Sequence, residues 1–397
     1  MRGVLKFLLS LILGIAIIWI GFWWYAQVRL QQGFEAWAER QASNGLKVSY
    51  VSARRGTSPL NAVLTIDQLT LVTPPGPDGE MIRVALPSLA LRIAALNPLV
   101  FHTDLPNQID VTVGNTVGIV LSAGSISASE NLDPNTLFNR RAYPFRGGDF
   151  AASNVQVLAS SLLVLHIDSV KSHADLNLGA GGNATAISTA TVLDGLTLSP
   201  LLTRIASVPF GGELAHLSLT AAISGPVPRD ISTLADQMDA IPHDRAAQQK
   251  LLIPVVHQWA SQGGNGKMAL EIVIGPSTIN AGGTLGFDAN LQPAGTAELS
   301  VDHLGDFTAA IVNSYPALQA DIAQAEAELS QYIGSTAQGG QTLGMHVTYG
   351  AGSVTVNGQK VAAMPPLDWT SLENPPPPPI QAPGDGSGAA SPAPATP

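Results

Sequence analysis

Twenty residues without a charged side chain, Phe7 to Ala26, stand near the start of the chain. As a helix rising about 1.5 Å per residue, this stretch reaches about 30 Å, the thickness of the hydrocarbon core of a bilayer. Aromatic residues close it, as they do at a membrane interface. The pattern predicts a membrane anchor over residues 1–26, a short cytoplasmic stub included, whose membrane-contacting residues are Phe7, Trp19, Trp23, Trp24 and Tyr25.

A cleaved secretory signal is the alternative, because Arg2 and Lys6 precede the apolar run. A signal normally has a shorter apolar region and small side chains at its cleavage site, where this chain has Trp23 and Trp24. The positive-inside rule leaves the amino terminus in the cytoplasm. We therefore expect a single-pass protein of the bacterial inner membrane whose bulk, from about Gln27, is periplasmic.

Helical spacing continues beyond the anchor, with Leu30, Phe34 and Trp37 on one face. This spacing predicts an amphipathic juxtamembrane helix over residues 27–44. Asn44 and Gly45 supply the left-handed cap that ends it. We expect Trp37 to pack against the sheet that follows.

From Leu46 the apolar positions recur every second residue, which predicts a first β-rich half over residues 45–229. In the segment 64–71 these positions change from even to odd numbers, so the strand must bulge or turn at Asp67–Gln68. Residues 154–167 are expected to form one strand. The cleanest alternation is at residues 216–223, with Leu217, Leu219 and Ile223 inward.

A second half is expected over residues 230–369: a helical insertion from Asp230, a β-meander, a helix and two closing strands. Beyond Trp369 the composition is Pro, Gly, Ala and Ser, including five prolines at 375–379. This composition predicts a disordered tail over residues 370–397 with polyproline II character. The predicted fold class is mainly β, or β-rich α+β: curved antiparallel sheets or a sandwich with few helices, preceded by one transmembrane helix.

The composition indicates the kind of fold and excludes several kinds of site and partner. Charged residues are only 12% of the chain, and 39 Gly and 29 Pro favour short strands joined by turns. The absence of Cys excludes disulfides and thiolate metal sites. A net charge of −10 repels phosphate backbones, so we expect no nucleic-acid partner.

The candidate chemical site is a doubled His-x-Asp pattern, His166 with Asp168 and His173 with Asp175. Residues two apart on a strand share a face, so each pair can present an imidazole and a carboxylate together, as a metal site requires. An exposed strand face is polar in any case, which is the simpler explanation. No Gly-x-Ser-x-Gly nucleophile motif is present, and Gly266–Lys267 lacks the spacing of a phosphate loop. We expect no catalytic residues, no cofactor and no bound metal.

The chain resembles a family known only as domain of unknown function 2125, found in alphaproteobacteria. The resemblance rests on the anchor with Trp37 and Gly45 behind it, and on the segment 216–302 with Trp259, Gly263–Gly264 and residues 292–295 (QPAG). Its strand pattern is similar, more distantly, to AsmA-type envelope proteins. That second likeness implies an inner-membrane anchor and a part in lipid traffic, and neither resemblance supplies catalytic residues.

Two hypotheses follow. In the first, a non-enzymatic β-rich module binds or guides an apolar, lipid-like ligand in the cell envelope. In the second, the module is a structural scaffold that engages another envelope protein.

Overall fold

The computed structural model describes residues 2–43, 45–58, 60–76, 79–94, 96–114, 117–134, 145–226, 233–234, 237–238, 241, 245–335 and 340–373, with side chains from residue 19 onward. The long first helix α1 is Arg2–Ser43. The other helices are α2 Pro200–Ala206, η2 Pro209–Gly212, α4 Arg245–Ser261, α5 Leu304–Ser314, η3 Pro316–Leu318, α6 Gln319–Glu328, η4 Ser330–Tyr332 and α7 Trp369–Glu373.

The first strands are β1 Lys47–Ser49, β2 Ser52–Arg55, β3 Asn61–Val72, β4 Ile82–Ala94, β5 Asn97–Asp104, β6 Gln108–Val113, β7 Val117–Ser122, β8 Ser125–Leu132, β9 Phe145–Ala159 and β10 Leu162–Leu176. The remaining strands are β11 Thr185–Leu198, β12 Glu213–Ser224, β13 Asn265–Ile274, β14 Ser277–Phe287, β15 Pro293–Asp302, β16 Ile333–Ser335, β17 Gln341–Gly350, β18 Ser353–Val356 and β19 Gln359–Ala363.

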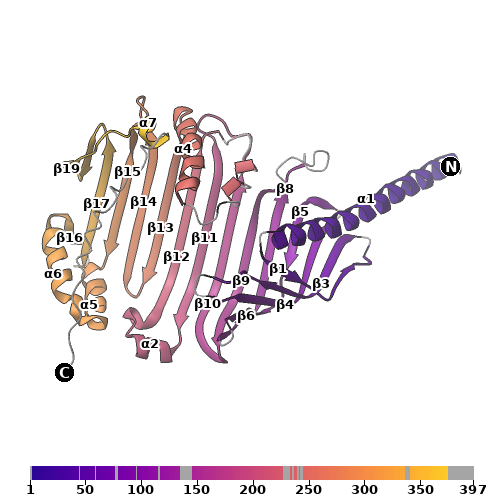
Figure 1. The fold of residues 1–397 in the computed structure, drawn as a ribbon, viewed down its shortest axis with the longest axis horizontal. Helices are drawn as coiled ribbons and strands as arrows, with labels where there is room; N and C mark the ends of the chain where they lie inside the picture. Colours follow the sequence, from indigo (N-terminus) through magenta and orange to yellow (C-terminus); the bar gives the residue numbers. More distant parts are fainter. Residues whose placement is uncertain are drawn as a thin grey trace, which may run out of the picture.

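These strands form one antiparallel sheet in which, from β9 to β15, each strand pairs with the next along the chain (Figure 1). β5 and β6 act as one interrupted strand beside β4, and β7 and β8 as another beside β9. The two predicted halves share the sheet, because β12 and β13 pair along nine positions. The prediction of a β-rich fold with a large antiparallel sheet and few helices is confirmed. The alternative of a sandwich is wrong, since every described strand belongs to the same sheet.

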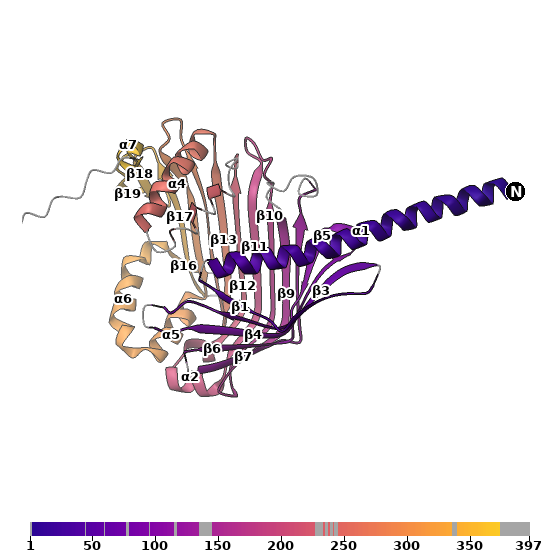
Figure 2. The same ribbon diagram turned by 45° about the vertical axis from the view of Figure 1, so that its right-hand side comes forward.

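The sheet is strongly curved. Figure 2 shows the first strands, from β1 to β7, running forward from the wall formed by β9 to β13, with α1 in the corner between them. Helices α5 and α6 cover the sheet at its other end, and α4 lies with α7 along one edge (Figure 1). The middle of the sheet lies between these covered ends.

A crease crosses the curved sheet at one level. The backbone pairing between neighbouring strands is interrupted at three places. The interruptions fall between Gln68 and Pro87, between Asn154 and Asp168, and between Asp168 and Gly195. Gln68, Asn154 and Gly195 have φ of 51°, 49° and 63°. At the crease the odd- and even-numbered positions of each strand exchange faces, because a left-handed residue moves the next side chain to the other face. The bulge or turn predicted at Asp67–Gln68 is confirmed, and it is the part of the crease that lies in β3.

The main core lies between α1 and the first strands. Leu30 and Phe34 of α1 are buried against Leu64 and Ile66 of β3, which have no exposed surface. Trp37 packs on the same cluster, as predicted. The helix ends at Ser43, and the φ of 86° at Gly45 confirms the left-handed cap after it, while Asn44 lies outside the described residues.

Several expected boundaries are wrong. Residues 154–167 are not one strand: a turn at Ser160 and Ser161, both with positive φ, divides β9 from β10. The tail predicted from residue 370 is also wrong at its start, since residues 370–373 belong to α7. The rest of that tail, and the start of the helical insertion at residues 230–232, lie outside the described residues.

Candidate functional site: the open apolar face of the sheet

The sheet has one apolar and one polar face. Directly paired residues on adjacent strands share a face. The apolar face is defined by the transverse row Leu64, Leu91, Thr103, Ala128, Phe150, Ser172, Thr191, Leu219, Leu270, Ala281, Leu299 and Met345. The polar face is defined by the row Ser129, Asp149, His173, Ala190, Thr220, Ala269, Gly282, Glu298 and His346.

The predicted polar cluster lies on the polar face of β10 as two separate pairs. His166 Nε2 is 3.0 Å from Asp168 Oδ1, and His173 Nε2 is 2.8 Å from Asp175 Oδ2. The seven residue steps from His166 to His173 correspond to about 23 Å of extended strand. The structure therefore does not bring the four residues together. Within the described residues, no group of three or more His, Asp or Glu could hold a metal ion.

Each pair has partners on neighbouring strands that the sequence did not reveal. His173 Nδ1 is 2.7 Å from Asp149 Oδ1 of β9, so both ring nitrogens face carboxylates. These bonds, the one to Asp149 first, raise the pKa of His173 above its ordinary value. All three side chains are about half exposed or more, so the arrangement stabilises a cationic imidazole at the surface without enclosing a ligand.

Next to the other pair, His216 Nδ1 is 2.7 Å from Asp194 Oδ1, and Ser169 donates to Asp194 Oδ2 over 2.9 Å. The hydrogen bond from His216, followed by the one from Ser169, holds the pKa of Asp194 below its usual range. These groups satisfy one another, which favours the simpler explanation of a polar strand face.

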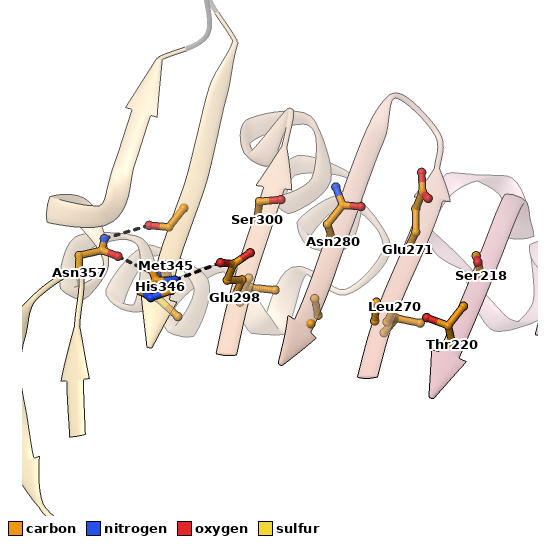
Figure 3. Close-up of a pocket in the computed structure, with 15 residues that line it drawn as sticks. Ser218, Thr220, Leu270, Glu271, Asn280, Glu298, Ser300, Met345, His346 and Asn357 are labelled. Carbon is orange, nitrogen blue, oxygen red and sulfur yellow. Dashed lines mark hydrogen bonds and ion pairs between the residues drawn. The ribbon is translucent and has the colours of Figure 1, made fainter. Parts of the chain in front are cut away.

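A hollow of about 550 Å³ lies farther along the polar face (Figure 3). Glu271, Asn280 and Glu298 project from three adjacent strands, and His346 Nδ1 lies 3.2 Å from Glu298 Oε1. Asn357 accepts a hydrogen bond from the His346 backbone over 2.7 Å and donates to Gly344 O over 3.1 Å. The hollow has polar groups on a flat sheet and no nucleophile held by a base.

Among the described residues, helices cover the apolar face at its two ends, and along one edge Trp259 of α4 lies against Phe287 of β14. At one end α1 seals Leu64, and at the other the helical segment with Leu304, Leu329 and Tyr332 covers Val301 and Leu343. Between them, large apolar side chains stay exposed on the same face: Leu219 at 38%, Met268 at 55%, and Phe150, Ile223 and Leu285 at similar levels.

The open part contains a groove of about 670 Å³. Phe145, Phe150, Ala174, Leu176 and Ile187 line it, and Gly147 and Gly148 form part of its floor. A side chain at Gly148 would press on the backbone of β8, so glycine keeps this floor clear. The groove and the exposed apolar row together form an apolar surface between α1 at one end and α5 and α6 at the other. Its shape suits an extended apolar ligand.

Glu130 interrupts this surface. Its position opposite Phe101 and Gly148 places it on the apolar face, and it lines the groove. Burial raises the pKa of Glu130. The sequence carried a signal for it, since Ile126, Ala128, Glu130 and Leu132 alternate and the glutamate falls on the apolar parity.

The model of one protein family, described as "Uncharacterized protein conserved in bacteria (DUF2125)", matches residues 23–365. The chain belongs to the DUF2125 family. The match covers α1 from Trp23, the whole sheet and the helices between its strands, so the family resemblance inferred from the sequence is confirmed. No curated protein and no solved structure matches the chain, and the more distant likeness to AsmA-type proteins stays a prediction.

The predicted anchor residues of this DUF2125 protein have different surroundings. Phe7 lies in α1, but its side chain is outside the described part, and Trp19 is half-buried. Trp23 donates its indole N–H to Asn61 O of β3 over 3.2 Å, so it contacts the sheet. Trp24 and Tyr25 are exposed. In the part of the chain that the structure describes, no helix has the length and apolar character needed to cross a membrane.

Proposed function

We propose that this DUF2125 protein is a non-enzymatic module that binds or guides an apolar, lipid-like ligand along the apolar face of its sheet. The observation that carries the proposal is the row of exposed Phe150, Leu219, Ile223 and Met268 beside the groove, between two ends of the same face that helices cover. Single exposed apolar residues are common, but a contiguous apolar strip of this kind marks a binding surface.

The energetics favour a chain-like ligand. Burial contributes about 0.8 kcal/mol for each methylene, so an acyl chain of about fourteen carbons would gain on the order of 10 kcal/mol before ordering costs. A ligand of that length runs across several strands, which lie about 4.8 Å apart. Because α1 and α5 cover the two ends of the apolar face, the ligand would lie along the transverse row of side chains between them.

The location is part of the proposal. We propose that the uncharged stretch Phe7 to Ala26 anchors the protein in the bacterial inner membrane, with the sheet in the periplasm. Its support is the length of the apolar run and the basic residues Arg2 and Lys6 before it. An anchored sheet could take a lipid from the membrane surface at its α1 end.

The proposal is tested with full-chain protein in detergent micelles and a fatty alcohol carrying a photoactivatable diazirine. Mass spectrometry of the crosslinked peptides should place the label on β9 to β13. Met268→Glu should reduce this labelling at least fivefold, because it puts a charge into the apolar strip. Ala269→Glu is the matched control: Ala269 is the next residue of β13, exposed on the polar face, and its substitution should leave labelling unchanged.

Labelling confined to α1, or equal losses in both variants, would remove the basis of the proposal. Turnover of a substrate by the protein would contradict its non-enzymatic part.

The second candidate function is a scaffold that engages another envelope protein. It is favoured by β19, whose five residues are all exposed and which, within the described chain, pairs only with β18. Such an edge can accept a strand from a partner. Crosslinking in membranes with Val361→Pro, which removes a backbone donor from this edge, should lose a partner under this hypothesis and leave lipid labelling intact.

A further inference from the structure

The groove on the apolar face contains a carboxylate without a partner among the described residues. Glu130 is half-buried, and among the described residues no hydrogen bond or ion pair is formed by its side chain. The other carboxylates that line the groove, Asp149 and Asp175, bind His173 on the polar face. Glu130 therefore supplies an unsatisfied negative charge beside apolar side chains.

Two arginines of the neighbouring strands, among the residues that the structure describes, are paired with other carboxylates. Arg146, two residues from Gly148 on β9, has its guanidinium 2.8 Å from Asp133. Arg92 pairs with Asp104 at 3.4 Å, and its neighbours in the sheet, His102 and Ser129, place it on the polar face. Burial removes water from the Glu130 carboxylate, and neither arginine replaces that water. Because the charged form is less well solvated, the pKa of Glu130 is raised.

The glycine floor leaves access to this carboxylate. The Cγ of Glu130 lies above Gly148, where an added Cβ would stand 3.4 Å from it. Phe145, Phe150 and Leu176 line the same groove. Ser172 also lines the groove on this face, and its hydroxyl is hydrogen-bonded to Thr191 over 3.0 Å. For a ligand that lies on these side chains, the charged group in reach on the apolar face is therefore Glu130, an acceptor with a negative charge.

We propose that the ligand of the groove is an amphiphile whose polar end is a protonated primary amine, bound by Glu130 while its acyl chain lies along the apolar face. Charge complementarity selects this class: an ammonium both neutralises the carboxylate and donates hydrogen bonds to it. An anionic end is repelled, and a neutral hydroxyl leaves the charge uncompensated. This inference rests on the proposed apolar site and adds the identity of the polar end.

The test uses full-chain protein in detergent micelles, with tetradecylamine, tetradecanol and myristic acid as competitors of the diazirine fatty-alcohol probe at pH 7. The three share chain length and differ in the polar end. Tetradecylamine should compete about tenfold better than tetradecanol, and myristic acid worst. This order is measured on the unmodified protein and does not depend on any variant.

Glu130→Gln should bring tetradecylamine to within twofold of tetradecanol without weakening tetradecanol. Glu271→Gln is the control, because it removes an exposed carboxylate from the polar face and so reproduces the change in net charge. Equal competition by amine and alcohol in the unmodified protein, or the same loss in both variants, overturns the assignment of the amine and leaves the apolar site standing. Competition by none of the three overturns the proposed function as well.

Discussion

A pair of leucines on one row of the sheet tests whether the middle of the apolar face is open. Leu64 and Leu219 lie on the same transverse row of the same face, but Leu64 has no exposed surface beneath α1, whereas Leu219 is 38% exposed. The perturbation is Leu→Ala at each site. The substitution removes the same atoms at both sites, one covered by α1 and the other partly exposed.

The expected magnitudes follow from the cover over each leucine. Truncating a fully buried leucine leaves a cavity, so Leu64→Ala should cost about 3–5 kcal/mol of the free energy of unfolding. At Leu219 solvent enters the space, which removes the cavity cost, and the part already exposed contributes nothing. The transfer of three methylene equivalents, about 2.4 kcal/mol when complete, scales to about 1.5 kcal/mol at 62% burial, the remainder of its 38% exposure.

The assay is urea unfolding of full-chain protein in detergent, followed by tryptophan fluorescence, with midpoints converted by a common slope. Trp37 lies in the core that Leu64 belongs to and reports on it directly. The reasoning is refuted if the two substitutions cost the same within about 0.5 kcal/mol, the precision usual for such comparisons. That outcome would mean that a part of the protein covers Leu219 in solution.

Three further predictions concern other parts of the sheet. Gly195→Ala should lower the free energy of unfolding by at least about 1–2 kcal/mol, because φ is +63° and the new Cβ would collide with the Asp168 side chain; an unchanged melting temperature would contradict this. NMR titration of His173 should have a midpoint above 6.5, and Asp149→Asn should lower it. The stability that this raised pKa contributes is present below about pH 6.5 and lost as the pH rises through the folded value, so a stability profile rising through that window would be inconsistent. Trp369→Ala should expose residues 365–373 to limited proteolysis, since Trp369 stacks on His257 at 4.6 Å and donates to Leu291 O; continued protection would show that the stack is dispensable.

The periodicity of the chain was enough to predict the class of fold and much of the face assignment. Alternation at residues 217–223 placed Leu217 and Leu219 on one face, and the parity change at Asp67–Gln68 located a break in β3. These features are local, because side-chain direction along a strand follows from the residue number. For the same reason the helical spacing of Leu30 and Phe34 identified the side of α1 that is buried.

The candidate site was less accessible to this reasoning. The predicted polar pairs at His166 and His173 are about 23 Å apart along β10, and the partners that satisfy them, such as Asp149, come from other strands. Nothing in the spacing of the two His-x-Asp patterns indicates which strands will flank β10. The polar cluster therefore proved to be part of a solvated face.

The sequence alone determined that the chain begins with a long apolar stretch, continues as a helix with one greasy side and then forms β-strands with one apolar side each, because these properties depend only on the order of side chains. Only the tertiary structure decided that the described strands join one creased sheet, that helices cover its apolar face at the two ends, and that Glu130 lines the groove between them without a partner among the described residues. The physical reason is that burial depends on what packs over a residue, and the segments that cover this face or leave it open are far away in the sequence.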